Sequence, residues 1–321
     1  MKQIVPILFF LFCWNLSDAQ QSQQFSLFSF NPASFNPGAT GMNPNVELIA
    51  LYRAQWAGLR GAPRYGQVNL QMGAEPLGGG IGGFFQEERL GSFVIQTANL
   101  SYSYALDLNR YSRLRIGVSG AYQSRSLDGN LIRTPGGNYE GEIDHNDQSL
   151  LPGEVNASAF VFNAGLWYES SIWNIGVSVR NLADQTFDLG AADLSPGRAY
   201  YAFVGAKFDV GRNMVFEPSL LFKSILIQNQ LDLNLKFTFN DNIILGGAFR
   251  GYDANSIDAA SVFAGLVISE KIKIVYAYDI GLSQLNDVQN GSHEIVLAFD
   301  FGKPLWKGKL PPIIYNQRIK R

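Results

Sequence analysis

Thr97–Leu108 reads Thr-Ala-Asn-Leu-Ser-Tyr-Ser-Tyr-Ala-Leu-Asp-Leu, which alternates polar or small residues with apolar residues at every step. Successive side chains of a β-strand point to opposite faces of its sheet, so this stretch predicts a strand with one apolar and one polar face. Similar alternation repeats from about residue 45 to residue 301, in long segments separated by turns. Long alternating segments behind a secretory signal favour a membrane β-barrel over a water-soluble sandwich.

Residues 1–19 are predicted to be a signal peptide. Lys2 supplies the positive charge, residues 4–14 the apolar stretch, and Ser17-Asp18-Ala19 a cleavage site of small residues. The apolar stretch is shorter than the about 20 residues that a membrane-spanning helix needs. Cys13, the only cysteine, lies within it. Its removal with the signal peptide would exclude disulfides, thiol chemistry and cysteine-ligated metals from the mature chain.

The composition fits a barrel with a lipid-facing surface and a polar lumen. No later segment is apolar enough for long enough to predict a membrane helix, and an exported chain that crosses a membrane with strands must close them into a barrel. The chain has 33 glycines, 13% aromatic and only 16% charged residues, and its mean hydropathy is close to zero. A net charge of −2 argues against nucleic acid as a partner.

Alternation and turn residues together predict about fourteen transmembrane antiparallel strands, which makes the fold class all-β. The predicted ranges are 45–56, 63–73, 77–87, 92–107, 111–126, 158–168, 172–181, 198–210, 213–223, 228–239, 243–252, 258–269, 271–280 and 292–301. Alternate connections are short, whereas the opposite set contains the long loops 127–157, 182–197 and 281–291. Short periplasmic turns and longer outer loops are typical of outer-membrane barrels. We therefore expect extracellular long loops and two periplasmic termini.

Charge placement predicts which face of each strand meets lipid. Asp232 and Lys236 share one face of their segment and leucines and phenylalanines the other, and Arg113 and Arg115 alternate with aliphatic residues. A register slip of one residue would turn these charges into lipid, at about 2–4 kcal/mol for a basic residue near the midplane. Candidates for interfacial aromatic girdles are Tyr102, Tyr104, Trp167, Tyr168, Trp173, Tyr200, Tyr201, Tyr276 and Tyr278.

Two segments flank the predicted barrel at 45–301. Residues 20–44 are rich in turn signals such as Asn31-Pro32 and Asn36-Pro37-Gly38, and can fold into the lumen as a small plug, which the sequence alone leaves open. Residues 302–321 form a basic periplasmic tail without an acidic residue. This tail is either a solvated extension or a docking segment for a periplasmic partner.

Signals for catalysis are poor, and we predict no catalytic, cofactor-binding or metal-binding residue. A barrel lipase needs a Ser–His pair, but His293 lies at a strand start, where a structural role is favoured. The glycines of 78–83 lack the lysine and helix of a phosphate loop. Acidic residues around Asp144 lack the turn glycine and spaced glutamate of a calcium loop.

Three blocks carry a resemblance to a known family. They are Phe25–Gly41 with its doubled Asn-Pro, Leu51–Arg64 with Tyr-Arg-Ala-Gln-Trp, and Gly291–Ile295 with Ser-His-Glu-Ile. With them the whole mature chain resembles the PorP/SprF outer-membrane proteins of the type IX secretion and gliding machinery of Bacteroidota, although the basic tail is longer than that family requires. The resemblance implies a non-enzymatic barrel that supports secretion or surface attachment of cargo with type B C-terminal domains, alongside periplasmic components of that system.

Two functions from different classes follow. The first is a secretion barrel that binds cargo through its outer loops, mainly 127–157 and 182–197; the second is a passive porin or a transporter of hydrophobic solutes. The residues expected to contact a partner are Trp56, Arg60, Arg64, Tyr139, Asp144 and Phe187. For Trp56, an anchoring role in the aromatic girdle is the competing interpretation. Fourteen strands enclose a lumen of intermediate width, which does not decide between the two functions.

Overall fold

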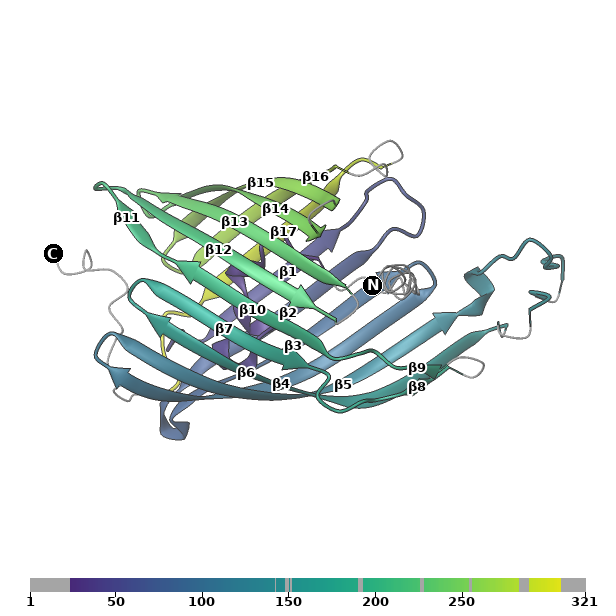
Figure 1. Cartoon of the computed structure of the whole chain (residues 1–321), viewed down its shortest axis with the longest axis horizontal. Helices are drawn as coiled ribbons and strands as arrows, with labels where there is room; N and C mark the ends of the chain where they lie inside the picture. Colours follow the sequence, from purple (N-terminus) through teal and green to yellow (C-terminus); the bar gives the residue numbers. More distant parts are fainter. Residues whose placement is uncertain are drawn as a thin grey trace, which may run out of the picture.

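The computed structural model of the chain describes residues 24–141, 143–147, 150, 152–189, 193–225, 228–253, 256–282 and 289–306. Antiparallel strands form one sheet that closes on itself as a barrel (Figure 1). Two short strands, β10 and β11, both pair with β12 and are parts of one interrupted strand, so the barrel has fourteen strands. The predicted fold class and strand number are confirmed.

The wall strands agree with the predicted ranges to within a few residues. They are β1 (Glu47–Ala54), β2 (Arg64–Ala74), β3 (Gly79–Leu90), β4 (Phe93–Asn109), β5 (Ser112–Asp128), β6 (Glu154–Ser170), β7 (Trp173–Arg180), β10 (Ala199–Ala206), β11 (Phe208–Val210), β12 (Met214–Ser224), β13 (Asn229–Phe239), β14 (Ile243–Asp253), β15 (Ser256–Ser269), β16 (Ile272–Gly281) and β17 (Ser292–Asp300). The largest difference is at β6, which begins at Glu154 because it pairs with β5 as far as Asp128. A further pair, β8 (Phe187–Asp188) and β9 (Asp193–Leu194), forms a small two-stranded sheet separate from the wall sheet.

The barrel closes between the first and last strands. β1 and β17 pair over their whole described length, with Leu51 opposite Val296 and Arg53 opposite Glu294. No helix in the described part of the chain is long and apolar enough to cross a membrane.

The two ends of the barrel differ in the length of their connections. We call the end with the turns after β2, β4, β6, β11, β13 and β15 the short-turn end, and the opposite end, where β5–β6, β7–β8 and β16–β17 are connected, the long-loop end. The two described ends of the chain do not share one side. Gln24 contacts Gln55, just beyond β1 at the long-loop end, whereas Lys303 contacts Val46 at the short-turn end. The expected pair of termini on one side stays a prediction, because neither terminus is among the described residues. The predicted signal peptide and residues 307–321 of the tail lie outside the described residues.

Apolar side chains cover the outside of the wall and polar ones face the lumen. In β4, Leu100 is 76% exposed on the outside and Asn99 is 5% exposed on the inside. Asp232, Arg113 and Arg115 are buried inside, as the charge pattern predicts. Two girdle assignments are wrong. Trp167 and Tyr201 face the lumen, because they share the inward parity of Glu169 and Phe203 on their strands.

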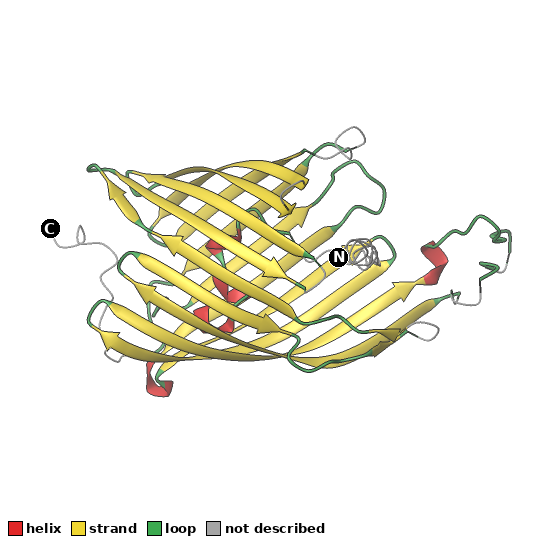
Figure 2. Ribbon diagram, viewed as in Figure 1, coloured by secondary structure: helices red, strands yellow, loops and turns green. Residues whose placement is uncertain are grey.

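Residues 24–44, the described residues before β1, lie inside the barrel, and we call them the lumen segment (Figure 2). It contains three single-turn 3-10 helices, η1 (Phe28–Phe30), η2 (Pro32–Ser34) and η3 (Pro37–Ala39). Proline opens the latter two, where its missing N–H costs no hydrogen bond. The Asn36 side chain caps η3 by accepting a hydrogen bond from Gly38 N at 2.8 Å.

Candidate functional site

The lumen segment is fixed to the wall along its whole length. Near the long-loop end, Glu294 accepts hydrogen bonds from the backbone N–H groups of Ser26 and Leu27 at 2.9 and 3.0 Å. At mid-lumen, Asn36 Nδ2 donates to the backbone oxygens of Leu166 and Val177 at 3.0 and 3.2 Å, which crosses from the segment to β6 and β7.

Nearer the short-turn end, the segment contacts β4 and β2. Ser103 Oγ donates to the backbone oxygen of Thr40 at 2.7 Å, and Gly41 N donates to Gln71 Oε1 at 3.2 Å. Inward side chains of the wall thereby bond backbone groups of the lumen segment that its 3-10 helices leave without partners. The segment is therefore part of the folded barrel.

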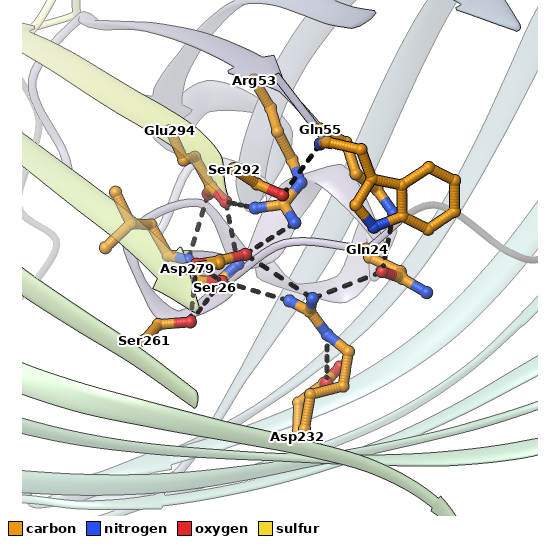
Figure 3. Close-up of polar contacts among 12 residues, drawn as sticks. Gln24, Ser26, Arg53, Gln55, Asp232, Ser261, Asp279, Ser292 and Glu294 are labelled. Carbon is orange, nitrogen blue, oxygen red and sulfur yellow. Dashed lines mark hydrogen bonds and ion pairs between the residues drawn. The ribbon is translucent and has the colours of Figure 1, made fainter. Parts of the chain in front are cut away.

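Buried ion pairs hold the part of the lumen segment nearest the long-loop end (Figure 3). Arg53 bridges Asp279 and Glu294, at 2.6 and 2.9 Å. Arg250 Nε pairs with Asp232 at 3.0 Å, and its Nη2 donates to Ser26 Oγ at 3.1 Å. Ser26 Oγ in turn donates to Asp279 at 2.7 Å. Charges from five wall strands are thus neutralised around one serine of the lumen segment.

Apolar side chains of the segment form a core within the lumen. Phe28 and Phe35 pack in one cluster with Trp167, Phe203 and Leu221 of the wall. Trp167 stacks on Phe203, with ring centroids 5.0 Å apart. Apolar side chains of the segment and of the wall therefore bury one another in this part of the lumen.

Glycines of the wall give the segment room. A Cβ atom on Gly117 of β5 would overlap the backbone of Pro37 and Gly38, and one on Gly80 of β3 would overlap the Thr40 oxygen. The glycine run that resembles a phosphate loop therefore lies mostly in β3, where glycine permits close backbone approach.

A chamber of about 610 Å³ lies above the segment, at the long-loop end. Gln24 and Phe25 of the segment contribute to it, and the rest of its lining comes from the strand ends and loops at that end of the barrel. Its aromatic and charged lining residues are Phe25, Arg53, Trp56, Arg64, Tyr65, Glu88, Phe93, Arg125, Arg180 and Tyr201. The volume is within the range of small-ligand sites, so it suits a few residues of a partner rather than a domain.

The structure brings two of the predicted contact residues together in this chamber. Trp56 and Arg64 both line it, whereas Arg60 lies exposed between them in the β1–β2 connection. Trp56 has a φ of 51°, in the left-handed region, and its N–H donates to Ser292 Oγ at 3.1 Å. The β1–β2 and β16–β17 connections are joined here, since Ala57 N also donates to the Gly291 oxygen at 2.8 Å.

The other three predicted residues do not line the chamber. Tyr139 and Asp144 belong to the β5–β6 loop, where Asn138 and Asp144 form an isolated β-bridge and Arg133 stacks over the Tyr139 ring at 4.4 Å. Phe187 of β8 is 0% exposed and lies under Arg125, whose guanidinium carbon is 4.6 Å from the ring centroid. In this arrangement Phe187 presents no surface to a partner, because the hairpin folds it inward.

The serine and histidine near the last strand do not form a catalytic pair. Ser292 is buried on the inward side beside Trp56. His293 follows it on the outward side, where Nδ1 lies 2.6 Å from the hydroxyl of Tyr276. Adjacent residues of a strand point to opposite faces, so Ser292 and His293 are turned apart.

Sequence reasoning missed the ion pairs and the chamber. Arg53 and Glu294 stand in two of the blocks that carry the family resemblance, and the residues on either side of each face outward. Their parity predicts inward side chains, but their pairing depends on the β1–β17 register. Neither segment alone predicts that register.

A closed wall with an apolar outside, a polar inside and a segment folded into the lumen defines an outer-membrane-type β-barrel. The family model described as "Type IX secretion system membrane protein PorP/SprF" matches residues 17–299. The chain belongs to this family, as the resemblance of its three blocks implies. The family is one of secretion-system membrane proteins rather than of enzymes.

Solved barrels are also similar to the chain. The CymD monoaromatic hydrocarbon channel is 13% identical, with a TM-score of 0.49 over 88% of this chain and 95% of that one. Omp33 of Acinetobacter baumannii is 8% identical, with a TM-score of 0.47 over 80% and 99%. A FadL homologue of Pseudomonas aeruginosa is 12% identical, with a TM-score of 0.46 over 84% and 94%. No curated protein matches the chain.

Proposed function

We propose that this barrel binds a secreted protein at its long-loop end and supports the secretion or surface attachment of that protein. The lumen segment is the observation that carries the proposal. It fills the middle of the barrel with hydrogen-bonded backbone and packed aromatic rings, and leaves the chamber at the long-loop end. A barrel of this build offers a binding surface at one end rather than a path through its centre. No step of this function calls for a catalytic group.

Membership of a type IX secretion family supports a protein as the ligand. In the proposal, the ligand is the C-terminal domain of a secreted cargo protein, of the type B class that the resemblance implies. The long loops face the cell exterior and the short turns face the periplasm. The basic residues after β17 then lie on the periplasmic side, where they meet other components of the secretion system.

A passive porin or hydrophobic-solute transporter is less well supported by the site. Porin selectivity needs charged side chains free to line an open constriction. Here Arg53, Arg250 and Asp232 are buried in ion pairs beside the lumen segment. The fold itself is compatible with both functions, and the packed lumen segment is the observation that favours binding.

Affinity capture tests the proposal. A tagged full-length copy is purified from native membranes in mild detergent, and the C-terminal domain of any large surface protein recovered with it is produced alone. We expect that domain to bind the purified barrel, and shortening of loop 127–157 to abolish binding. As a matched control, Arg110→Gln at the short-turn end leaves binding unchanged. A correctly folded barrel that binds no such domain would contradict the proposal.

A further inference from the structure

The chamber carries an excess of positive charge. Its charged lining residues in the described part of the chain are four arginines and one carboxylate, Glu88. Arg53 is neutralised by Asp279 and Glu294. Arg64 and Arg180 differ from it: neither side chain makes a hydrogen bond or an ion pair with another described residue. An anionic group entering the chamber would therefore meet two guanidinium groups outside any described ion pair, with Glu88 as the one carboxylate among the described lining residues.

Arg180 lies deep in this arrangement. It ends β7 opposite Ala199 and also borders a small cavity beside Ser34 and Phe35 of the lumen segment. Arg64 is exposed at the start of β2, nearer the mouth. The two arginines thus place positive charge both at the floor and at the rim of the chamber.

The remaining lining narrows the class of anion. Aromatic rings of Trp56 and Phe93 stand beside the amides of Gln24, Gln55 and Asn181. Gln55 Nε2 donates to Gln24 Oε1 at 3.1 Å, and Asn181 Nδ2 donates to the Gly197 oxygen at 3.0 Å. An amide side chain can make more than one hydrogen bond, and the hydrocarbon of a fatty acid offers it none. An extended peptide end offers backbone N–H and C=O groups to the amides, side chains to the rings and a carboxylate to the arginines.

We propose that the chamber receives the C-terminal end of a protein chain, with the terminal carboxylate paired to Arg180 and an apolar last side chain against the aromatic rings. Arg64, at the mouth, attracts the carboxylate as it enters. This inference rests on the proposed function and names the part of the cargo that enters the barrel. The volume of about 610 Å³ accommodates a few residues, so the rest of the bound domain contacts the loops outside.

A peptide pool provides the probe. N-terminally fluorescein-labelled hexapeptides, randomised at four positions and ending in Phe or Leu, are made with a free carboxylate and as the matched C-terminal amide. Fluorescence anisotropy with the full-length barrel in detergent measures binding. We expect the free acid to bind about tenfold more tightly than the amide, or better, because a desolvated charge pair is lost in the amide. The preference should weaken as salt is raised.

Variants assign the preference to the chamber. Arg180→Gln should remove the preference for the free acid, and Arg64→Gln should reduce it, whereas Arg180→Lys should retain part of it. Arg110→Gln, exposed at the short-turn end, is the matched control and should leave it unchanged. If Arg180→Gln does not fold, Arg64→Gln decides, since its exposed side chain is not part of the lumen core.

Equal binding of acid and amide, or an acid preference that survives both arginine substitutions, would overturn this inference. A captured cargo domain that binds equally well with a Gly-Ser extension after its last residue would also overturn it, while leaving the proposed function intact. Conversely, a preference for free carboxylates in a barrel that captures no secreted protein would contradict the proposed function and leave the chamber chemistry standing.

Discussion

Arg53 Nη1 donates to Glu294 Oε2 at 2.9 Å across the seam where β1 meets β17, and the same carboxylate accepts the backbone N–H groups of Ser26 and Leu27. One side chain therefore takes part in closing the barrel and in holding the lumen segment. Both partners are almost completely buried, so the pair has little access to water. The two tasks are coupled, because the charge of Glu294 is balanced only when the first and last strands are paired.

Glu294→Gln should destabilise the barrel by about 3–5 kcal/mol, because Arg53 loses one of its two partners in a buried site. Urea unfolding of the purified barrel in detergent measures the change. Glu87→Gln, which removes an exposed pair with Arg89, is the control and should cost about 0–1 kcal/mol. Equal effects of the two substitutions would show that the seam pair has no special role.

Gly117→Val should displace the lumen segment without opening the wall. The added side chain would occupy the place of the Pro37 and Gly38 backbone. Hydrogen exchange at residues 36–41 should become faster, while the barrel keeps its heat-dependent mobility on gels. Gly120→Val on the same strand is the matched control, since a Cβ there meets only the Phe162 ring at 3.7 Å. Unchanged exchange in Gly117→Val would contradict the close packing of η3 on β5.

Trp167→Ala should cost about 3–5 kcal/mol, because it removes a large ring from the packed lumen and leaves a cavity. Trp173→Ala provides the comparison, since this second tryptophan, on β7, is 44% exposed on the outside. The unfolding midpoints of the two variants in detergent should differ, with Trp167→Ala the lower. A larger loss of stability for Trp173→Ala than for Trp167→Ala would contradict the packing of Trp167 in the lumen.

The sequence predicts the strands of the wall, but it does not predict which residues pack inside the lumen. Alternation in stretches such as Thr97–Leu108 predicts strands and their facing, because period-two patterning acts within each strand. Residue type alone assigns Trp167 to an interfacial aromatic girdle, and this assignment ignores the parity of its position in the strand. Its parity with Glu169 predicts the inward direction that the structure shows.

Long-range contacts account for the rest. The pairs of Arg53 with Asp279 and Glu294 join residues more than 200 positions apart, and only the closed register brings them together. The chamber depends on where the lumen segment ends beneath the loops, which neither turn signals nor composition fix. Asn-Pro turns predict an irregular segment, but its position in the lumen follows from hydrogen bonds such as that between Ser178 Oγ and the Phe35 oxygen at 2.7 Å.

In the proposed function the barrel works by binding at one end, with its lumen closed by residues 24–44. Conductance of the full-length protein in planar lipid bilayers tests it most directly, with Gly117→Val inserted in parallel as the control for a loosened lumen. We predict no stable conductance from the wild type, and measurable openings from Gly117→Val. A large, stable and solute-dependent conductance of the wild-type barrel would contradict the account and identify a transporter.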